Sequence, residues 1–295
     1  HEPAFGSVTF GAGGSTLSYT AETVKHLSAQ HGLVSVPHLS CMGGTREEIK
    51  ASLDQYRDQG CKRVIALRGD MPSGMARTGD MHFASDLVRF IKEGYGDGFE
   101  ITVACYPEIH PQAEGAFNDI ARFVEKARLG ASSAITQYFY NADAYFRFVD
   151  DVRRQGIDIP IIPGIMPISN FSQLRRFSQL CGAEIPRWMA QRMQDYGDDA
   201  ESIREFAADC VADLCRRLID GGAGAELRAA GDQAIGDAAS KNAETEQGER
   251  RGRVAGVDPV GDLEVGVEHD HVLAAGEPGD LLELDGEGVG DEPEV

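Results

Sequence analysis

Polar side chains that could do chemistry follow short apolar runs of the chain at intervals of 29 to 38 residues. In order, the residues at the ends of these runs are Thr9, His38, Arg68, Tyr106, Gln137 and, as an apolar exception, Met166. Hydroxyl, imidazole, guanidinium, phenol and amide groups together can bind a large polar ligand through hydrogen bonds and charge. Their regular spacing indicates that repeated structural units present them at one edge of the molecule.

The tripeptide Arg68-Gly69-Asp70 follows the apolar run Val64–Leu67 directly. A guanidinium can meet a phosphate or a ring carbonyl with two donors, and a glycine lets a planar ligand approach the main chain. The carboxylate of Asp70 can stabilise a nearby cation. An exposed turn with a weak Arg–Asp pair is the alternative interpretation.

The segment from Tyr106 to Pro111, Tyr-Pro-Glu-Ile-His-Pro, carries three polar side chains within six residues. Two prolines stiffen a loop that carries a phenol, a carboxylate and an imidazole, and such a rigid presentation is costly unless a ligand binds there. A rigid turn with a hydrogen-bonded histidine is the alternative interpretation. Glu108 and His110 do not predict a metal site, because no second cluster completes a coordination sphere. Motifs for acyl transfer, nucleotide hydrolysis and zinc proteolysis are absent from the sequence.

The elements that must position these residues alternate along the chain. The apolar runs are four to six residues long, too short for helices, so each is predicted to be a buried strand. They are Ser7–Phe10, Val34–Leu39, Val64–Leu67, Ile101–Cys105, Ala134–Phe139 and Ile161–Met166. Amphipathic helices are predicted between them. One begins at a capping box of Thr45 and Glu48, and another follows Asn141 with Tyr145, Val149 and Val152 on one face.

Repeated strand and helix units predict an α/β fold with parallel strands and right-handed crossovers. An open doubly wound sheet would be complete with six strands, whereas a (β/α)8 TIM barrel would need two more. The glycine pattern of dinucleotide-binding open sheets is missing, since Gly11-Ala12-Gly13-Gly14 has the wrong spacing. Polar groups at one rim of consecutive strands favour the barrel, here incomplete because its first and last strands are not recognisable.

Composition excludes several classes of protein. The chain has 295 residues and a formal net charge of −20, and no window approaches the ~18 consecutive apolar residues of a membrane span. Without a basic stripe, no nucleic-acid partner is expected. The six cysteines are dispersed without a Cys-x-x-Cys pair, which predicts reduced thiols, no metal and a cytoplasmic location.

The composition changes abruptly near Ala223. Residues 1–222 contain every aromatic, methionine and cysteine residue, and are predicted to form the folded domain. Residues 223–295 hold 19 acidic and 5 basic side chains and contain no Phe, Tyr, Trp, Met or Cys with which to build a core. We interpret this tail either as an acidic disordered extension or as the product of an out-of-frame reading, since Gly, Ala, Val, Asp and Glu dominate it.

Ordered motifs over residues 3 to about 222 resemble the methylenetetrahydrofolate reductase family. They are Val8–Thr16, Pro37–Cys41, Ala66–Asp70, Tyr106–Pro111, Ala134–Phe139, Ile162–Ile168, Ser169–Phe171 and Ile185–Met189. The resemblance implies a barrel that binds FAD noncovalently and reduces 5,10-methylenetetrahydrofolate to 5-methyltetrahydrofolate, with NADH or NADPH as hydride donor. It places the chain in one-carbon metabolism and methionine biosynthesis. The oligomeric state stays open, with a homo-oligomer as one alternative.

The resemblance also implies roles for individual residues. The positions that match FAD-binding positions of the family are Thr9, His38, Arg68, Gly69, Asp70, Ala84, Tyr106, His110, Ala113, Asp119 and Lys126. Asp70 is also implied to act catalytically, by stabilising the iminium cation formed as the methylene bridge of the folate opens. Gln137 and Phe171 match positions that hold folate or nicotinamide by hydrogen bonding and ring stacking.

Departures from the family pattern bear on activity. The family's first strand carries a Glu that acts as general acid, and this chain begins after that segment. Arg122 and Glu125 replace an Asn and a basic residue that are common in the family. The main prediction is a flavoprotein oxidoreductase. The alternative is a non-catalytic or misfolded fragment that retains part of the flavin site.

Overall fold

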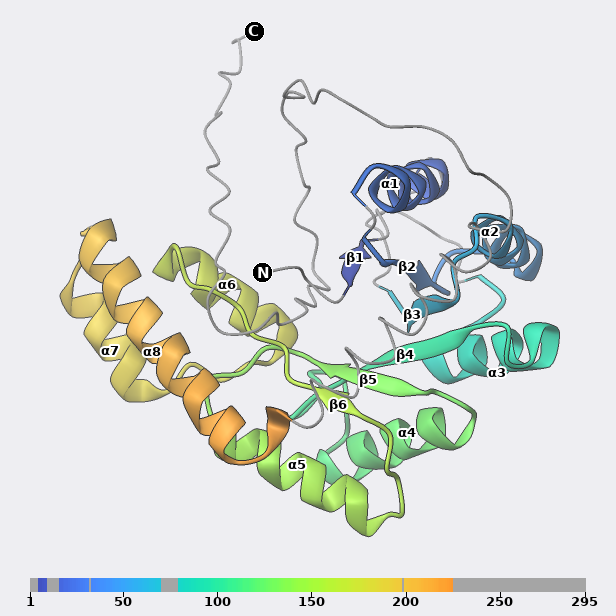
Figure 1. The fold of residues 1–295 in the computed structure, drawn as a ribbon. Coiled ribbons are helices and arrows are strands. Elements are labelled where there is room, and N and C mark those ends of the chain that lie inside the picture. The colour runs from blue at the N-terminus through green and yellow to red at the C-terminus, as the bar shows by residue number, and fades with distance from the viewer. Residues whose placement is uncertain (1–4, 10–15, 32, 70–78, 198, 225–295) are drawn as a thin grey trace, which may run out of the picture.

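The computed structural model describes residues 5–9, 16–31, 33–69, 79–197 and 199–224. Asp70, the predicted catalytic carboxylate, lies outside the described residues. So do the glycine-rich segment within residues 10–15 and the tail from residue 225. Within the described part, six strands alternate with helices α1 to α5, and three more helices follow the last strand (Figure 1).

The bounds of these elements follow the predicted alternation. The strands are β1 (Gly6–Val8), β2 (Ser35–Ser40), β3 (Arg63–Leu67), β4 (Glu100–Cys105), β5 (Ser133–Thr136) and β6 (Ile161–Ile162). The helices are α1 (Thr16–His31), α2 (Arg46–Asp58), α3 (Ala84–Tyr95), α4 (Ala116–Arg128), α5 (Ala142–Arg154), α6 (Phe171–Cys181), α7 (Arg187–Asp195) and α8 (Ala200–Asp220).

All described strands form one parallel sheet in the chain order β1-β2-β3-β4-β5-β6. The sheet curls, and helices α1 to α5 line its convex side in Figure 1. A doubly wound sheet would carry helices on both faces and reverse its strand order at a switch point. The fold is therefore an incomplete (β/α)8 barrel, which confirms the predicted fold class.

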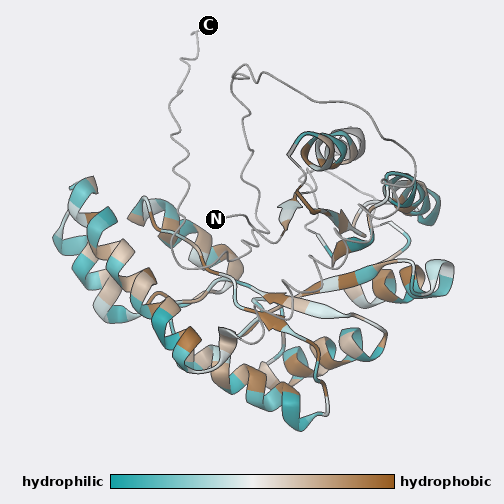
Figure 2. Cartoon of the chain, viewed as in Figure 1, coloured by the Kyte–Doolittle hydropathy of each residue, from teal (hydrophilic) through white to brown (hydrophobic). Residues whose placement is uncertain are grey.

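Alternating strand residues build a separate apolar cluster on each face of the sheet. On the convex face, Leu39, Val64 and Ile101 belong to a large cluster with helix residues such as Leu87 and Phe148. The concave face carries a smaller cluster of Phe5, Val36, Ile65, Leu67, Ile135 and Ile162. In Figure 2 the strands are largely hydrophobic, and much of the helix surface is hydrophilic. The core thus lies mainly between the sheet and its helices.

Strand β6 is shorter than predicted. The apolar run Ile161–Met166 was expected to be extended throughout, but the strand ends at Ile162. Pro163 has no main-chain donor for a ladder. The next residue, Gly164, donates its N–H to the Oγ1 of Thr136 at 2.9 Å, and a Cβ there would lie 2.3 Å from the Thr136 carbonyl oxygen. This close approach turns the chain away after two strand residues.

The helix starts are close to those predicted. The Thr45 Oγ1 accepts from the Glu48 N–H at 3.1 Å, and a Glu48 carboxylate oxygen accepts from the Thr45 N–H at 2.7 Å. Asn141 caps α5 through its side-chain oxygen. Phe148 lies deeper in the core than the predicted Val149, which is partly buried. Local sequence rules therefore positioned the helices well.

Candidate functional site

The described candidate residues lie at the carboxyl edge of the sheet. They are Thr9 after β1, His38 near the end of β2, Arg68 and Gly69 after β3, Tyr106 after β4 and Gln137 after β5. Parallel pairing places these strand ends along one edge, as the register of Cys105 beside Thr136 shows for β4 and β5. His38 lies inside β2 rather than after it, and is almost fully buried.

A chain of hydrogen bonds joins the end of β3 to the loop that follows β4. The Arg68 Nη1 donates to the Gln112 Oε1 at 2.5 Å, and the Gln112 N–H donates to the His110 Nδ1 at 3.0 Å. The His110 N–H in turn donates to an Asp119 carboxylate oxygen at 3.0 Å. The rings of Tyr106 and His110 pack edge to face with centroids 4.6 Å apart. We call these five residues the Arg68–His110 network.

The hydrogen bond received by His110 determines its neutral tautomer. Because the Nδ1 accepts from the Gln112 N–H, a neutral ring carries its proton on Nε2. Nε2 is then a donor, and Arg68 adds a permanently charged one. The network therefore offers N–H donors suited to an anionic or carbonyl-bearing ligand.

Lys126 adds a second cation next to this network. It lies on α4, and its Nζ donates to the Ala104 carbonyl oxygen at 2.5 Å. Burial of the ammonium group lowers the pKa of Lys126, while the nearby Cys105 and Asp119 act in the opposite direction. Enclosing a charged amine has a cost in free energy, which an anionic ligand would offset.

Gly69 is required for a reason that the sequence did not reveal. Its φ is +78°, and a Cβ at this position would lie 1.9 Å from the Ser40 Oγ. The hydroxyl of Ser40 on the neighbouring strand already fills the space that a Cβ would take. Close approach of a ligand to the main chain at Gly69 stays a prediction.

Three further predicted positions, Ala113, Ala84 and Thr9, lie in the described residues. Ala113 follows Gln112, and its N–H donates to the His110 carbonyl oxygen at 2.8 Å. Ala84 is the first residue of α3. The main-chain oxygen of Thr9 accepts from the Thr20 hydroxyl at 3.1 Å, which ties the end of β1 to α1.

The two predicted folate positions are not members of the network. The Gln137 N–H donates to the Cys105 carbonyl oxygen at 2.8 Å, and its side-chain oxygen accepts from the Tyr138 N–H at 2.9 Å. Phe171 begins α6, is 9% exposed, and has the Arg175 guanidinium 5.9 Å from its ring centre. Both lie on the β5 and β6 side of the edge.

Sequence reasoning missed the contacts of three residues that shape this edge. Gln112 bridges Arg68 and His110, and Ser40 contacts the turn after β3. Glu108 was named as a polar group of the loop after β4, but its contact was not predicted: it accepts the Glu184 N–H at 2.7 Å and so ties this loop to the segment after α6. Strand alternation from His38 to Ser40 was one available signal, because residues two apart share a face.

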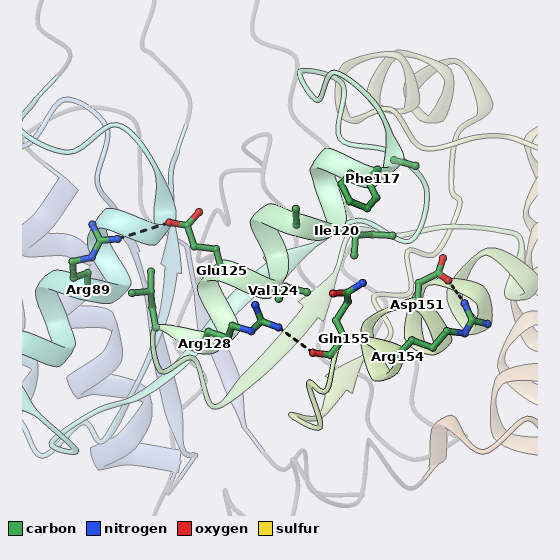
Figure 3. Close-up of a pocket in the computed structure, with 12 residues that line it drawn as sticks. Arg89, Phe117, Ile120, Val124, Glu125, Arg128, Asp151, Arg154 and Gln155 are labelled. Carbon is green, nitrogen blue, oxygen red and sulfur yellow. Dashed lines mark hydrogen bonds and ion pairs between the residues drawn. The ribbon is translucent and has the colours of Figure 1, made fainter.

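Two hollows lie near α4. A groove of about 710 Å³ runs over the outer faces of α4 and α5, where Arg89 pairs with Glu125 at 3.8 Å and Arg154 pairs with Asp151 (Figure 3). It lies on the helical side, away from the strand ends. A cleft of about 390 Å³ is lined in part by Gln112, Ala113 and Arg122, and so adjoins the network.

Neither a metal cluster nor a membrane span is found in the part of the chain that the structure describes. No group of three or more His, Cys, Asp or Glu side chains is placed to hold a metal ion there. None of the described helices has the length and apolar character needed to cross a membrane. The six cysteines all lie in the described residues, and none of them forms a disulfide.

Comparison with known proteins gives consistent matches. The family model described as methylenetetrahydrofolate reductase matches residues 1–227. The 5,10-methylenetetrahydrofolate reductase of Escherichia coli K12 is 40% identical over 217 residues, which cover 74% of this chain and 72% of that protein. Methylenetetrahydrofolate reductase (NADH) 1 of Zea mays is 35% identical over 232 residues, covering 74% of this chain and 39% of that protein.

Proposed function

Because the chain belongs to the methylenetetrahydrofolate reductase family, we propose that it reduces 5,10-methylenetetrahydrofolate to 5-methyltetrahydrofolate with FAD and NADH or NADPH. The observation that carries the proposal is the Arg68–His110 network, which connects residues at four of the positions that the family resemblance assigns to FAD. The product would supply methyl groups for methionine biosynthesis.

The donor set at this edge fits a planar cofactor that carries phosphates. Arg68 and Lys126 supply positive charge, and His110 supplies an N–H donor at Nε2 when neutral. The adjoining 390 Å³ cleft extends the edge along α4. FAD bound there would supply the hydride-transfer chemistry between the nicotinamide and the folate. The protein's part is to bind, orient and exclude water from these partners.

The folate would lie toward β5 and β6. Gln137 can offer an amide to the pterin, and Phe171 can offer a ring face, if their present contacts open. Asp70, directly after Gly69 in the sequence, would stabilise positive charge on the opening methylene bridge. These substrate roles belong to the proposal, as does the assignment of the activity to a domain of residues 1–222.

The test is to express and purify the full chain and look for the absorbance of a bound flavin. NADH and NADPH are then compared as reductants with a quinone acceptor, and 5,10-methylenetetrahydrofolate is added as the final acceptor. We expect flavin absorbance, oxidation of at least one nicotinamide, and formation of 5-methyltetrahydrofolate. Each half-reaction is measured separately by single-turnover kinetics.

The outcomes separate the proposal from its alternative. Flavin binding and nicotinamide oxidation without folate reduction would support the fragment interpretation, because hydride transfer to the flavin does not require a general acid for the folate nitrogen. A purified chain that binds no flavin would contradict the proposed function.

A further inference from the structure

Ser40 lies at the end of β2 and contacts the turn after β3. It is four residues after Val36 of the concave cluster, so its side chain shares that face of the sheet. The Ser40 Oγ donates to the Arg68 carbonyl oxygen at 2.9 Å. The Met42 N–H donates to the same oxygen at 2.9 Å and approaches the Ser40 Oγ at 3.3 Å. These groups fix the direction of the Arg68 carbonyl.

The next residue strengthens this restraint. Gly69 places its main chain against Ser40 so closely that a Cβ would overlap the hydroxyl at 1.9 Å. The turn is therefore held by a hydrogen bond before Gly69 and by close packing at it. Because the Arg68 guanidinium also reaches Gln112, the orientation of the main chain at Arg68 decides where its charge points.

The neighbouring thiol cannot replace this hydroxyl. The Cys41 Sγ lies 3.5 Å from the Arg68 carbonyl oxygen and 3.6 Å from the Phe83 carbonyl oxygen. Burial, with a smaller contribution from Asp86, raises the pKa of Cys41 to about 12, so the thiol stays protonated. A thiol is a weak donor. The hydroxyl of Ser40 is thus the stronger side-chain donor to this carbonyl.

We infer that Ser40 is a positioning residue for Arg68, which directs the guanidinium into the ligand site without contacting the ligand itself. The inference rests on the proposed function in so far as Arg68 binds the flavin. The restraint that Ser40 places on the Arg68 carbonyl can be measured without any flavin, because the Met42 N–H donates to the same carbonyl oxygen.

The first arm measures hydrogen exchange of the Met42 amide in the full, flavin-free chain. We expect faster exchange in Ser40→Ala and restored protection in Ser40→Thr, which keeps the hydroxyl. The matched control is Ser133→Ala, whose hydroxyl pairs with that of Thr102 at 2.8 Å in the same sheet. Ser133 is the first residue of β5, so it lies at the amino end of its strand, whereas Ser40 lies at the carboxyl end of β2. The control should leave Met42 exchange unchanged.

The second arm measures the dissociation constant of FAD. Loss of one positioning hydrogen bond should weaken binding roughly three- to tenfold in Ser40→Ala, with recovery in Ser40→Thr. In an Arg68→Ala background, Ser40→Ala should cause no further loss, because its effect passes through Arg68. A merely structural role would weaken FAD binding equally in both backgrounds, and this result would overturn the inference.

The two arms distinguish the inference from the proposed function. Unchanged Met42 exchange in Ser40→Ala would refute the hold on Arg68, whether or not the chain binds flavin. A parent chain without flavin affinity would refute the proposed function, while the exchange measurement would still decide whether Ser40 holds the Arg68 carbonyl.

Discussion

At the scale of single residues, a substitution of Lys126 is expected to affect FAD affinity and the free energy of unfolding in different ways. Its ammonium is buried, which disfavours the charged form, yet it lies beside the Arg68–His110 network. In Lys126→Met the cost of desolvating the ammonium group disappears, and the methionine side chain is similar in length to that of lysine. We expect FAD affinity to fall by roughly tenfold or more, as for the loss of a charge-assisted hydrogen bond, while the free energy of unfolding is kept or raised.

Fluorescence titration with FAD and urea unfolding of the flavin-free chain measure these two quantities. The control is Lys50→Met on α2, where Lys50 forms an exposed pair with Asp54. It should leave FAD affinity unchanged. Equal FAD affinity in Lys126→Met and the parent would contradict a role for Lys126 in binding the phosphates of FAD.

Glu108 predicts a pH dependence of stability. Burial raises its pKa above the ordinary value of 4.5, against the opposing hydrogen bond from the Glu184 N–H. Above pH 4.5, and up to the raised pKa, the native state therefore holds more protons than the unfolded state. The contribution of Glu108 to the free energy of unfolding then falls as pH rises through that window.

Glu108→Gln should remove this contribution, because an amide does not titrate but can still accept from the Glu184 N–H. We expect the free energy of unfolding to decline less from pH 4.5 upward in the variant than in the parent. Urea titrations at a series of pH values measure the difference. Superimposable pH profiles of the variant and the parent would show that the Glu108 carboxyl titrates alike in the native and unfolded states.

At the scale of elements, the connection from β6 to α6 depends on Gly164. An added methyl group would meet the Thr136 carbonyl oxygen at 2.3 Å, so Gly164→Ala must displace this connection from β5. We expect a loss of about 1–3 kcal/mol in the free energy of unfolding, as for other overpacking changes.

The same substitution at Gly94 is the matched control, because nothing lies within 4 Å of a Cβ added there on helix α3. Gly94→Ala should raise the free energy of unfolding by about 0.5–1 kcal/mol, since alanine favours the helix. Denaturant unfolding compares the two variants. A loss of stability at Gly94 similar to that at Gly164 would contradict a local clash as the cause.

At the scale of the whole molecule, the apolar core of the described residues extends as far as Ala223, and α8 contributes Ala207, Leu214 and Leu218 to it. A chain ending at Gly224 should therefore unfold with the same urea midpoint and m value as the full chain. The m value reports the surface exposed on unfolding. A lower midpoint or m value would show that residues beyond 224 contribute to the fold.

A chain ending at Asp195 is the contrasting truncation. It lacks α8, so core residues that pack against this helix would be exposed. We expect a broad transition and a smaller m value. The pair of truncations thus tests whether the folded domain ends near the predicted boundary at residue 222.

Much of this architecture follows from local pattern. Short apolar runs predicted every strand of the described sheet, and the Thr45 capping box predicted the start of α2, because strand burial and helix capping depend on neighbouring residues. The end of β6 escaped prediction because it depends on Gly164 meeting Thr136, a residue 28 positions away. Asp70 lies outside the described residues, so its catalytic role stays a prediction.

The sequence alone determined the order of strands and helices, the edge that carries the polar residues and, through its motifs, the family. The folded chain was needed to show that Gln112 connects Arg68 to His110, and that Ser40 occupies the space beside Gly69. Arg68 and Gln112 are 44 residues apart in the chain. Such contacts form only when parallel pairing brings neighbouring strand ends together. A local sequence pattern therefore does not predict which side chains contact each other there.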